Sequence, residues 1–132
     1  MAIFFICKRY FFVVGCEKKG NCWKMKESEL QKLCTERLLK HPEVYGWRNN
    51  TGAVKTGKRF IKYGFPGSPD FIGLLSNGRF IGVEFKSEKG KQSENQIRLE
   101  KEILQRRGIY KVISDLEQFE IFYRNLFVLC KP

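Results

Sequence analysis

The sequence GSPDFIGLLSNGRFIGVEFK, from Gly67 to Lys86, contains two short apolar runs, Phe71 to Leu75 and Phe80 to Phe85. Between them lies Ser76-Asn77-Gly78. An Asn-Gly pair between residues that favour strands is the strongest short-range signal for a β-hairpin. The pattern therefore predicts two antiparallel strands joined by a tight turn.

This predicted hairpin brings three charged side chains together. Pro69 suits the first position of a strand because it cannot donate a ladder hydrogen bond, so Asp70 opens the first strand. Antiparallel pairing places the start of the first strand beside the end of the second, where Glu84 and Lys86 lie. Alternate residues of a strand point to the same face, so Glu84 and Lys86 share one. We expect Asp70 to lie beside both.

Two carboxylates beside a lysine are typical of a site for Mg²⁺ or Mn²⁺, which prefer carboxylate, carbonyl and water ligands. The backbone carbonyl of Phe85 is a candidate third ligand, and Lys86 is a candidate for orienting an attacking water. The alternative is a surface ion pair between Glu84 and Lys86, which contributes only ~0–1 kcal/mol. The Pro-Asp pair at hairpin distance and the basic chain favour the metal site.

The order of Gly67-x-Pro69-Asp70, Glu84-x-Lys86 and Gln96 on a following helix resembles the PD-(D/E)xK nuclease superfamily. Within it, the chain is similar to the small stand-alone members of the VRR-NUC family carried by bacteriophages. The resemblance extends from Lys26 to Phe122 and includes the segment Trp47 to Gly52. The Val-Arg-Arg element that names the family is not visible, so the superfamily is the firmer assignment.

The resemblance implies an α/β, restriction-endonuclease-like fold and a divalent-metal-dependent deoxyribonuclease. It also implies action on branched, flap or four-way junction DNA by a homodimer. In such nucleases Gln96 would contact the metal-bound water or the phosphate, and a glutamate of the first helix would complete the metal site. Glu29 is our candidate for that glutamate, with Glu27 and Glu36 as alternatives. A carboxylate in a first turn also stabilises the helix by itself.

The composition is compatible with this interpretation. The chain has 132 residues, 25 Lys and Arg against 14 Asp and Glu, and a net charge of +11. This length fits one domain, and the charge favours a polyanionic partner, either nucleic acid or an anionic membrane, between which charge alone does not choose. The five cysteines include no Cys-x-x-Cys pair, which argues against a zinc ribbon and for reduced thiols. We expect Cys34 and Cys130 in the core, and a cytoplasmic location in a bacterial or phage-infected cell.

The first residues of the chain are apolar but do not resemble a membrane segment. Residues 2–16 are too short to span a bilayer, and Lys8-Arg9 interrupts them, so a signal peptide is also a poor fit. We expect no membrane partner. Residues 1–24 are interpreted as an N-terminal extension, either an extra hairpin or a translated leader ahead of a start at Met25. Residues 25–132 are then a single nuclease domain.

The rest of the chain predicts an alternation of helices and strands. Capping boxes at Ser28, Ser93 and Ser114 indicate three helix starts. The strand after the second helix should run parallel to the strand before it, which makes the sheet mixed. The predicted order is α-β-β-β-α-β-α, with helices over 29–40, 93–107 and 115–126 and with strands over 44–48, 71–75, 80–85 and 109–113.

Residues 52–59 nearly match a phosphate-binding P-loop but lack its final Ser or Thr, and no buried strand leads into them. We therefore expect no nucleotide cofactor and interpret this region as a mobile basic loop. Such a loop can follow a phosphate backbone. The candidate DNA contacts are Arg48, Asn50, Lys55, Lys58, Arg59 and Lys62.

Two alternatives to a structure-specific nuclease stay open. One is a restriction-type endonuclease that reads sequence. The other is a basic DNA-binding module without catalytic activity, in which the acidic cluster is incidental.

Overall fold

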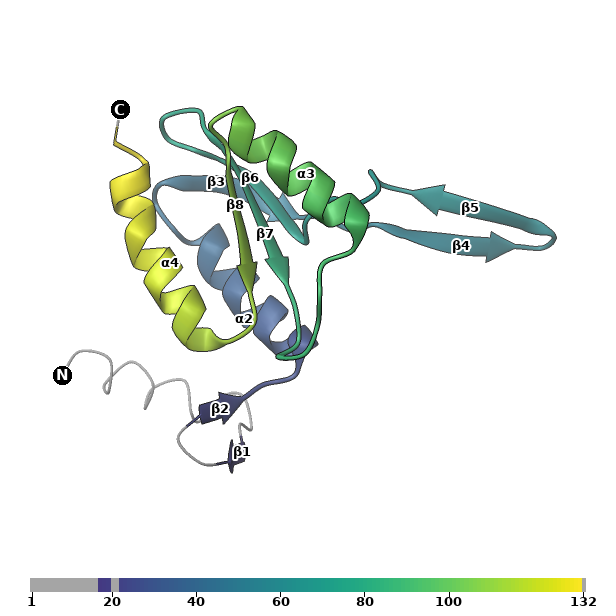
Figure 1. Cartoon of the computed structure of the whole chain (residues 1–132), viewed down its shortest axis with the longest axis horizontal. Coiled ribbons are helices and arrows are strands. Elements are labelled where there is room, and N and C mark those ends of the chain that lie inside the picture. The colour runs from purple at the N-terminus through teal and green to yellow at the C-terminus, as the bar shows by residue number, and fades with distance from the viewer. Residues whose placement is uncertain (1–16, 20–21, 132) are drawn as a thin grey trace.

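A four-stranded sheet forms the centre of the protein in a computed structural model, which describes residues 17–19 and 22–131 (Figure 1). The strand order is β3-β6-β7-β8. β7 pairs antiparallel with β6 and parallel with β8, so the predicted mixed sheet is confirmed. The four strands have the predicted bounds, Val44–Arg48 for β3, Phe71–Leu75 for β6, Phe80–Phe85 for β7 and Ile109–Ile113 for β8.

Three helices of the described ranges cover the two faces of this sheet. Helices α2 (Glu27–Leu39) and α4 (Leu116–Leu129) lie on one face, and α3 (Glu94–Gln105) lies on the other (Figure 1). The core fills the space between the sheet and the α2–α4 face. Its fully buried side chains include Leu30, Leu38, Phe71, Ile81, Val83, Phe85, Ile113, Phe119 and Leu126. Cys34 and Cys130 are buried there as free thiols, as predicted.

The helix starts differ in part from the capping prediction. Ser93 caps α3, where its side chain accepts a hydrogen bond from the Gln96 N–H, as predicted. The predicted caps at Ser28 and Ser114 are wrong. Lys26 occupies the N-cap position of α2, and the Asp115 side chain caps α4 by accepting from Gln118 N at 2.8 Å. An Asp carboxylate is as good a cap as a Ser hydroxyl, so the neighbouring residue took the position.

Residues 52–63 form a hairpin, so the prediction of a loop is wrong for this segment. Strands β4 (Gly52–Thr56) and β5 (Arg59–Tyr63) pair antiparallel and project away from the sheet (Figure 1). We call this hairpin, residues 52–63, the arm. Gly57 takes a positive φ of 61° at its turn, a conformation that glycine adopts without strain. From α2 onward the order is therefore α-β-β-β-β-β-α-β-α, with the arm inserted between β3 and β6.

Short strands precede the main body of the protein. β1 (Glu17–Lys19) and β2 (Cys22–Lys24) pair with each other antiparallel. The other residues of the N-terminal extension, 1–16 and 20–21, lie outside the described residues, so the leader interpretation stays a prediction. In the part of the chain that the structure describes, no helix has the length and apolar character needed to cross a membrane.

Candidate active site

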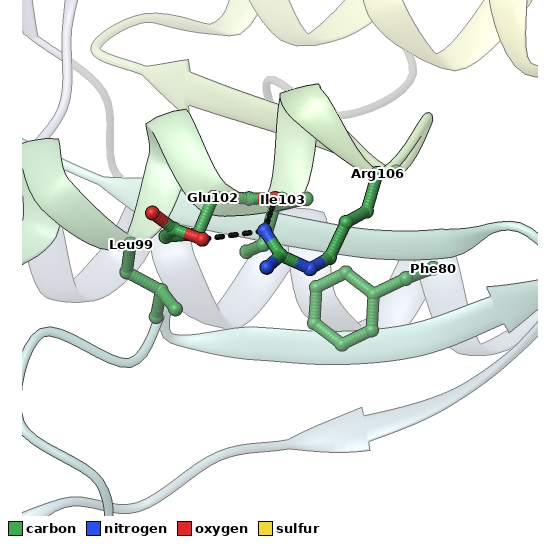
Figure 2. A pocket seen from close by; sticks show the side chains of 6 residues that line it. Phe80, Leu99, Glu102, Ile103 and Arg106 are labelled. Atoms are coloured by element: carbon green, nitrogen blue, oxygen red, sulfur yellow. Dashed lines mark hydrogen bonds and ion pairs between the residues drawn. The ribbon is translucent and has the colours of Figure 1, made fainter.

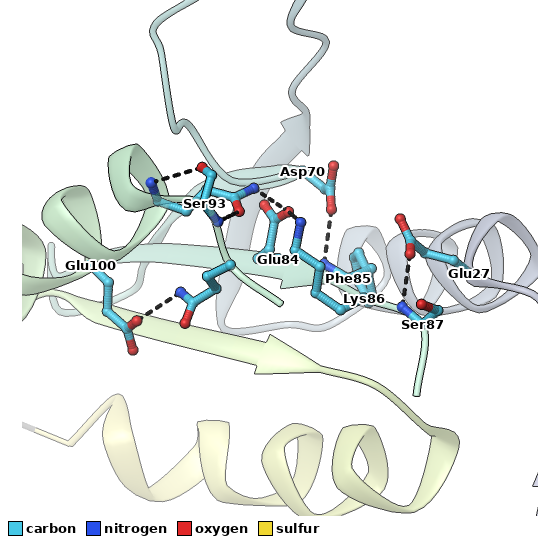
Figure 3. A network of polar contacts seen from close by, with 10 residues as sticks. Glu27, Asp70, Glu84, Phe85, Lys86, Ser87, Ser93 and Glu100 are labelled. Carbon is cyan, nitrogen blue, oxygen red and sulfur yellow. Dashed lines mark hydrogen bonds and ion pairs between the residues drawn. The ribbon is translucent and has the colours of Figure 1, made fainter. Parts of the chain in front are cut away.

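The site lies where β6 begins and β7 ends, at one end of the two central strands (Figure 3). Asp70 directly precedes β6, and its Oδ2 accepts a hydrogen bond from the Phe85 N–H at 2.8 Å. Lys86 directly follows β7, and its Nζ lies 3.0 Å from Oε1 of Glu84. The structure thus brings Asp70, Glu84 and Lys86 together, as the hairpin geometry predicts.

Gln96 joins this group from the first turn of α3. Its Nε2 donates to Oε1 of Glu84 at 2.6 Å, while its Oε1 accepts from the Ser93 N–H at 2.8 Å. One amide therefore completes the capping box of α3 and holds the Glu84 carboxylate. The two bonds fix the orientation of the amide, because only its nitrogen can donate to the carboxylate.

Gly67 of the sequence motif allows this approach of α3. Its φ is +81°, and a Cβ built on it would lie 2.8 Å from the backbone nitrogen of Gln96 and closer still to the carbonyl oxygen of Asn95. A side chain at this position would therefore strain the backbone and push the loop away from the first turn of α3. The glycine of the Gly-x-Pro-Asp motif thus serves packing between the Asp70 loop and α3.

Asn49 is a functional candidate that sequence analysis missed. It follows β3, and its N–H donates to the backbone carbonyl of Asp70 at 2.7 Å. Its side-chain Nδ2 donates to the Pro69 carbonyl at 2.9 Å and to the Ser68 hydroxyl. The sequence shows Asn49 only as one residue of a polar turn, because its partners lie far along the chain.

The glutamate of α2 that approaches the site is Glu27, and the structure does not bring Glu29 there. Oε2 of Glu27 accepts a hydrogen bond from the Ser87 N–H at 2.7 Å (Figure 3). Glu29 instead accepts a hydrogen bond from the Lys26 N–H at 3.3 Å and so caps the N-terminus of α2. Glu36 is exposed two turns further along the helix. Both glutamates lie in the first turn of α2, but residues two apart differ in direction by about 200°, so their carboxylates lie on different faces of the helix.

Burial raises the pKa of both central carboxyl groups. Glu84 is 3% exposed, and its pKa is raised mainly by desolvation and to a smaller extent by repulsion from Asp70. Hydrogen bonds from Lys86 and Gln96 act in the opposite direction and lower this pKa. Desolvation also raises the pKa of Asp70, and the negative charge of Glu27 adds to this increase. The Phe85 N–H and the Lys86 charge act in the opposite direction. Both carboxylates are therefore ionised at a cost that a nearby cation would offset.

The arrangement fits a divalent cation held by two carboxylates and a carbonyl. Oε2 of Glu84 is buried and has no hydrogen-bond partner, which is unfavourable for a carboxylate unless a cation or water reaches it. Lys86 N donates to Ile113 of β8, so the N–H and C=O of Phe85 face the opposite side, toward Asp70. Within the described ranges, no group of three or more His, Cys, Asp or Glu side chains is arranged to hold a metal. Two carboxylates plus waters suit Mg²⁺, which keeps part of its water shell.

The basic candidates lie outside this cluster. Arg48, at the end of β3, is close enough for its charge to lower the pKa of Asp70 slightly, and Asn50 is exposed two residues later. The others, Lys55, Lys58, Arg59 and Lys62, are all exposed on the arm. The structure therefore separates the four basic residues of the arm from the catalytic candidates, whereas Arg48 lies within electrostatic reach of Asp70.

A hollow of about 240 Å³ between α3 and the start of β7 lies away from the site (Figure 2). Its lining residues are Phe80, Leu99, Glu102, Ile103, Arg106 and Gly108. The one carboxylate among them, Glu102, pairs with Arg106 one turn along α3. Because Phe80 is the first residue of β7 and Glu84 lies near its last, this hollow is at the opposite end of the strand and contains none of the candidate residues.

No family model, curated protein or solved structure matches this chain. The residues of the site and their geometry are therefore what indicates the function of the protein.

Proposed function

We propose that this protein is a divalent-metal-dependent endonuclease that hydrolyses phosphodiester bonds in DNA, with Asp70, Glu84 and Lys86 at its centre. One observation carries the proposal. Glu84 is buried with Oε1 held by Lys86 and Gln96 and with Oε2 left without a partner, directly beside a second desolvated carboxylate. A surface ion pair would not need this burial, since its partners would remain in water.

Asp70, Glu84 and the carbonyl of Phe85 would hold Mg²⁺ or Mn²⁺. Glu27, rather than Glu29, is the further carboxylate that this proposal includes, because its charge acts on Asp70 and it is anchored at Ser87. When bound, such an ion stabilises the negative charge that develops on the phosphate and lowers the pKa of a coordinated water.

The other residues of the site orient the attacking water and hold the two carboxylates in place. The Lys86 ammonium group has three N–H donors, one directed at Glu84, and can hold a water in line with the phosphorus atom. Gln96 keeps the Glu84 carboxylate in place, and the Phe85 N–H does the same for Asp70. Asn49 fixes the backbone of the Asp70 loop. These contacts come from the ends of β3 and β7 and from the first turn of α3, so the site needs these three elements to be in place.

For the substrate, we propose branched, flap or four-way junction DNA cleaved by a homodimer, as the resemblance implies. The net charge of +11 supports a nucleic-acid substrate. Exposed apolar residues on α4, Ile121, Phe127 and Val128, support an association of two copies. Cleavage of linear duplex at one sequence would instead indicate a restriction-type enzyme.

The test is cleavage of four-way junction and linear duplex DNA with Mg²⁺, with Mn²⁺ and with a chelator. We expect metal-dependent cleavage by the wild type and its loss in Asp70→Asn and Lys86→Ala. Glu36→Gln and Lys40→Ala are matched controls, because they remove the same charges at exposed positions of α2 and its C-cap. If the wild type binds DNA but cuts it with neither ion, the protein is a DNA-binding module and the proposal is wrong. If the two site variants cut as fast as the wild type, the assignment of the site is wrong.

A further inference from the structure

The arm has two chemically different faces. Residues directly opposite each other on antiparallel strands share a face, and the face alternates along each strand. Lys55 pairs with Phe60 and Ala53 with Lys62, so these residues form one face, which carries two lysines. We call it the basic face.

The second face carries Val54 opposite Ile61 at its centre, Tyr63 opposite Gly52 at the base of the arm, and Thr56 opposite Arg59 next to the turn. We call it the apolar face. Val54 and Ile61 are 51% and 52% exposed, although both are β-branched aliphatic residues that normally pack against a partner. The arm therefore presents two exposed aliphatic residues at the centre of one face, with Arg59 beside the turn, and two lysines with Phe60 on the other face.

The charge of the arm identifies the chemistry of its partner. Residues 49–69 contain Lys55, Lys58, Arg59 and Lys62 and no Asp or Glu. Four positive charges without an acidic neighbour on a projecting hairpin are complementary to a polyanion. The apolar face could by itself pack on a protein, but the charge on the same element favours DNA.

The dimensions of the arm fit a groove of duplex DNA. Each strand has five residues, so the ribbon is ~17 Å long at ~3.4 Å per residue, with its strands ~4.8 Å apart. The major groove, ~12 Å wide and ~8.5 Å deep, admits a two-stranded ribbon. Val54 and Ile61 have short side chains, so they contact DNA only if their face lies on the groove floor. There they can pack against the apolar methyl groups of thymine. Lysines have long stems that reach the phosphates from the outer face.

The base of the arm is tied to the catalytic site. β4 begins three residues after Asn49, and the chain returns from β5 to Ser68 and Pro69, which Asn49 binds through its side chain. Asn49 also binds the backbone of Asp70. DNA held by the arm would therefore be held at a fixed offset from the carboxylates.

We propose that the arm is a duplex-binding ribbon that lies in the major groove, with Val54 and Ile61 toward the base pairs and Lys55 and Lys62 on the phosphates. Binding of the arm would place a DNA strand beside Asp70, and this part of the inference rests on the proposed function. If the arm acts in this way, the protein requires a substrate that has a duplex segment next to the cleaved bond.

The test is equilibrium binding of the full chain to a short labelled duplex, and to the single strand of the same sequence, in the presence of a chelator. No cleavage occurs under these conditions, so a failure of the nuclease proposal does not affect the result. Lys55→Ala/Lys62→Ala should weaken duplex binding about tenfold and reduce the slope of log K against log salt by roughly 2. The matched control is Lys40→Ala/Lys131→Ala. It removes the same charge from exposed positions at the far end of α2 and beside the Asn77 turn, and should leave both quantities at wild-type values.

The second variant, Val54→Thr/Ile61→Thr, keeps β-branched side chains but makes the apolar face polar. We expect weaker duplex binding with an unchanged salt slope and an unchanged mass in light scattering. Wild-type duplex affinity of Lys55→Ala/Lys62→Ala would overturn the proposal, as would an equal or greater loss of affinity for the single strand. Unchanged duplex binding by Val54→Thr/Ile61→Thr together with a lower mass would show that a second copy of the chain covers the apolar face instead.

Discussion

Replacing Asn49 with alanine should destabilise the loop that carries Asp70. The substitution removes the two side-chain hydrogen bonds to Pro69 and Ser68 and keeps the backbone bond to Asp70. Each lost bond contributes about 1 kcal/mol, so the free energy of unfolding should fall by about 2 kcal/mol. For a domain of this size that corresponds to a decrease in Tm of about 8 °C.

Thermal unfolding without DNA or metal measures this effect, and Asn50→Ala is its matched control. Asn50 is the same residue type at the next position, but it is exposed, so its replacement should change stability by less than about 0.5 kcal/mol. If Asn49→Ala and Asn50→Ala unfold at the same temperature, Asn49 does not hold the loop. The positioning role that we assign to it would then be wrong.

Three further predictions concern the surroundings of the two carboxylates. Gly67→Ala should lower Tm and slow cleavage, because its Cβ would collide with the backbone of Asn95; wild-type values for both would contradict the close packing. The raised pKa of Glu84 means that the folded state binds its proton more tightly than the unfolded state, so stability falls as pH rises through that pKa. Without metal at neutral pH, Glu84→Gln should therefore unfold at a higher temperature than the wild type, and this difference should disappear in acid. A lower Tm of Glu84→Gln at neutral pH would show that the Glu84 charge stabilises the folded state, contrary to this prediction. Glu27→Gln should slow cleavage more than Glu29→Gln, measured as initial rates at one Mg²⁺ concentration, and the reverse order would restore Glu29 as the residue of the site.

The central hairpin could be predicted from sequence because its signals are local. The Asn-Gly turn and the apolar runs around it determine strand bounds, direction and register, and these place Asp70 opposite the end of β7 without knowledge of the rest of the chain. The Ser93 capping box likewise predicts the start of α3 and the position of Gln96 in its first turn.

The arm could not be predicted in the same way. Its strands, GAVKT and RFIKY, place two adjacent apolar residues before a single lysine and show no strict alternation of apolar and polar residues, so the pattern does not distinguish a strand from a solvated loop. Its pairing contributes no buried face that would mark the segment as a strand. Only the cross-strand register reveals that Lys55 and Lys62 lie on one face and that Val54 and Ile61 lie on the other.

The glutamate of α2 and the role of Asn49 depend on tertiary contacts. Glu27 and Glu29 both lie in the first turn of α2, about 200° apart around the helix axis, so the packing of α2 on the sheet decides which of them faces the end of β7. Asn49 acts on residues that the arm separates from it, so nothing near it in the sequence indicates its partners.

Direct binding of Mn²⁺ to the protein without DNA tests the metal site itself, and the electron paramagnetic resonance signal of free Mn²⁺ reports it. We expect the wild type and Glu36→Gln to bind the ion with equal affinity, and Asp70→Asn and Glu84→Gln to lose that binding. Binding in the wild type should weaken as pH is lowered, because protons compete for two carboxylates whose pKa values are raised. Absence of binding in the wild type, or equal binding by Asp70→Asn, would show that these two carboxylates do not share a metal ion.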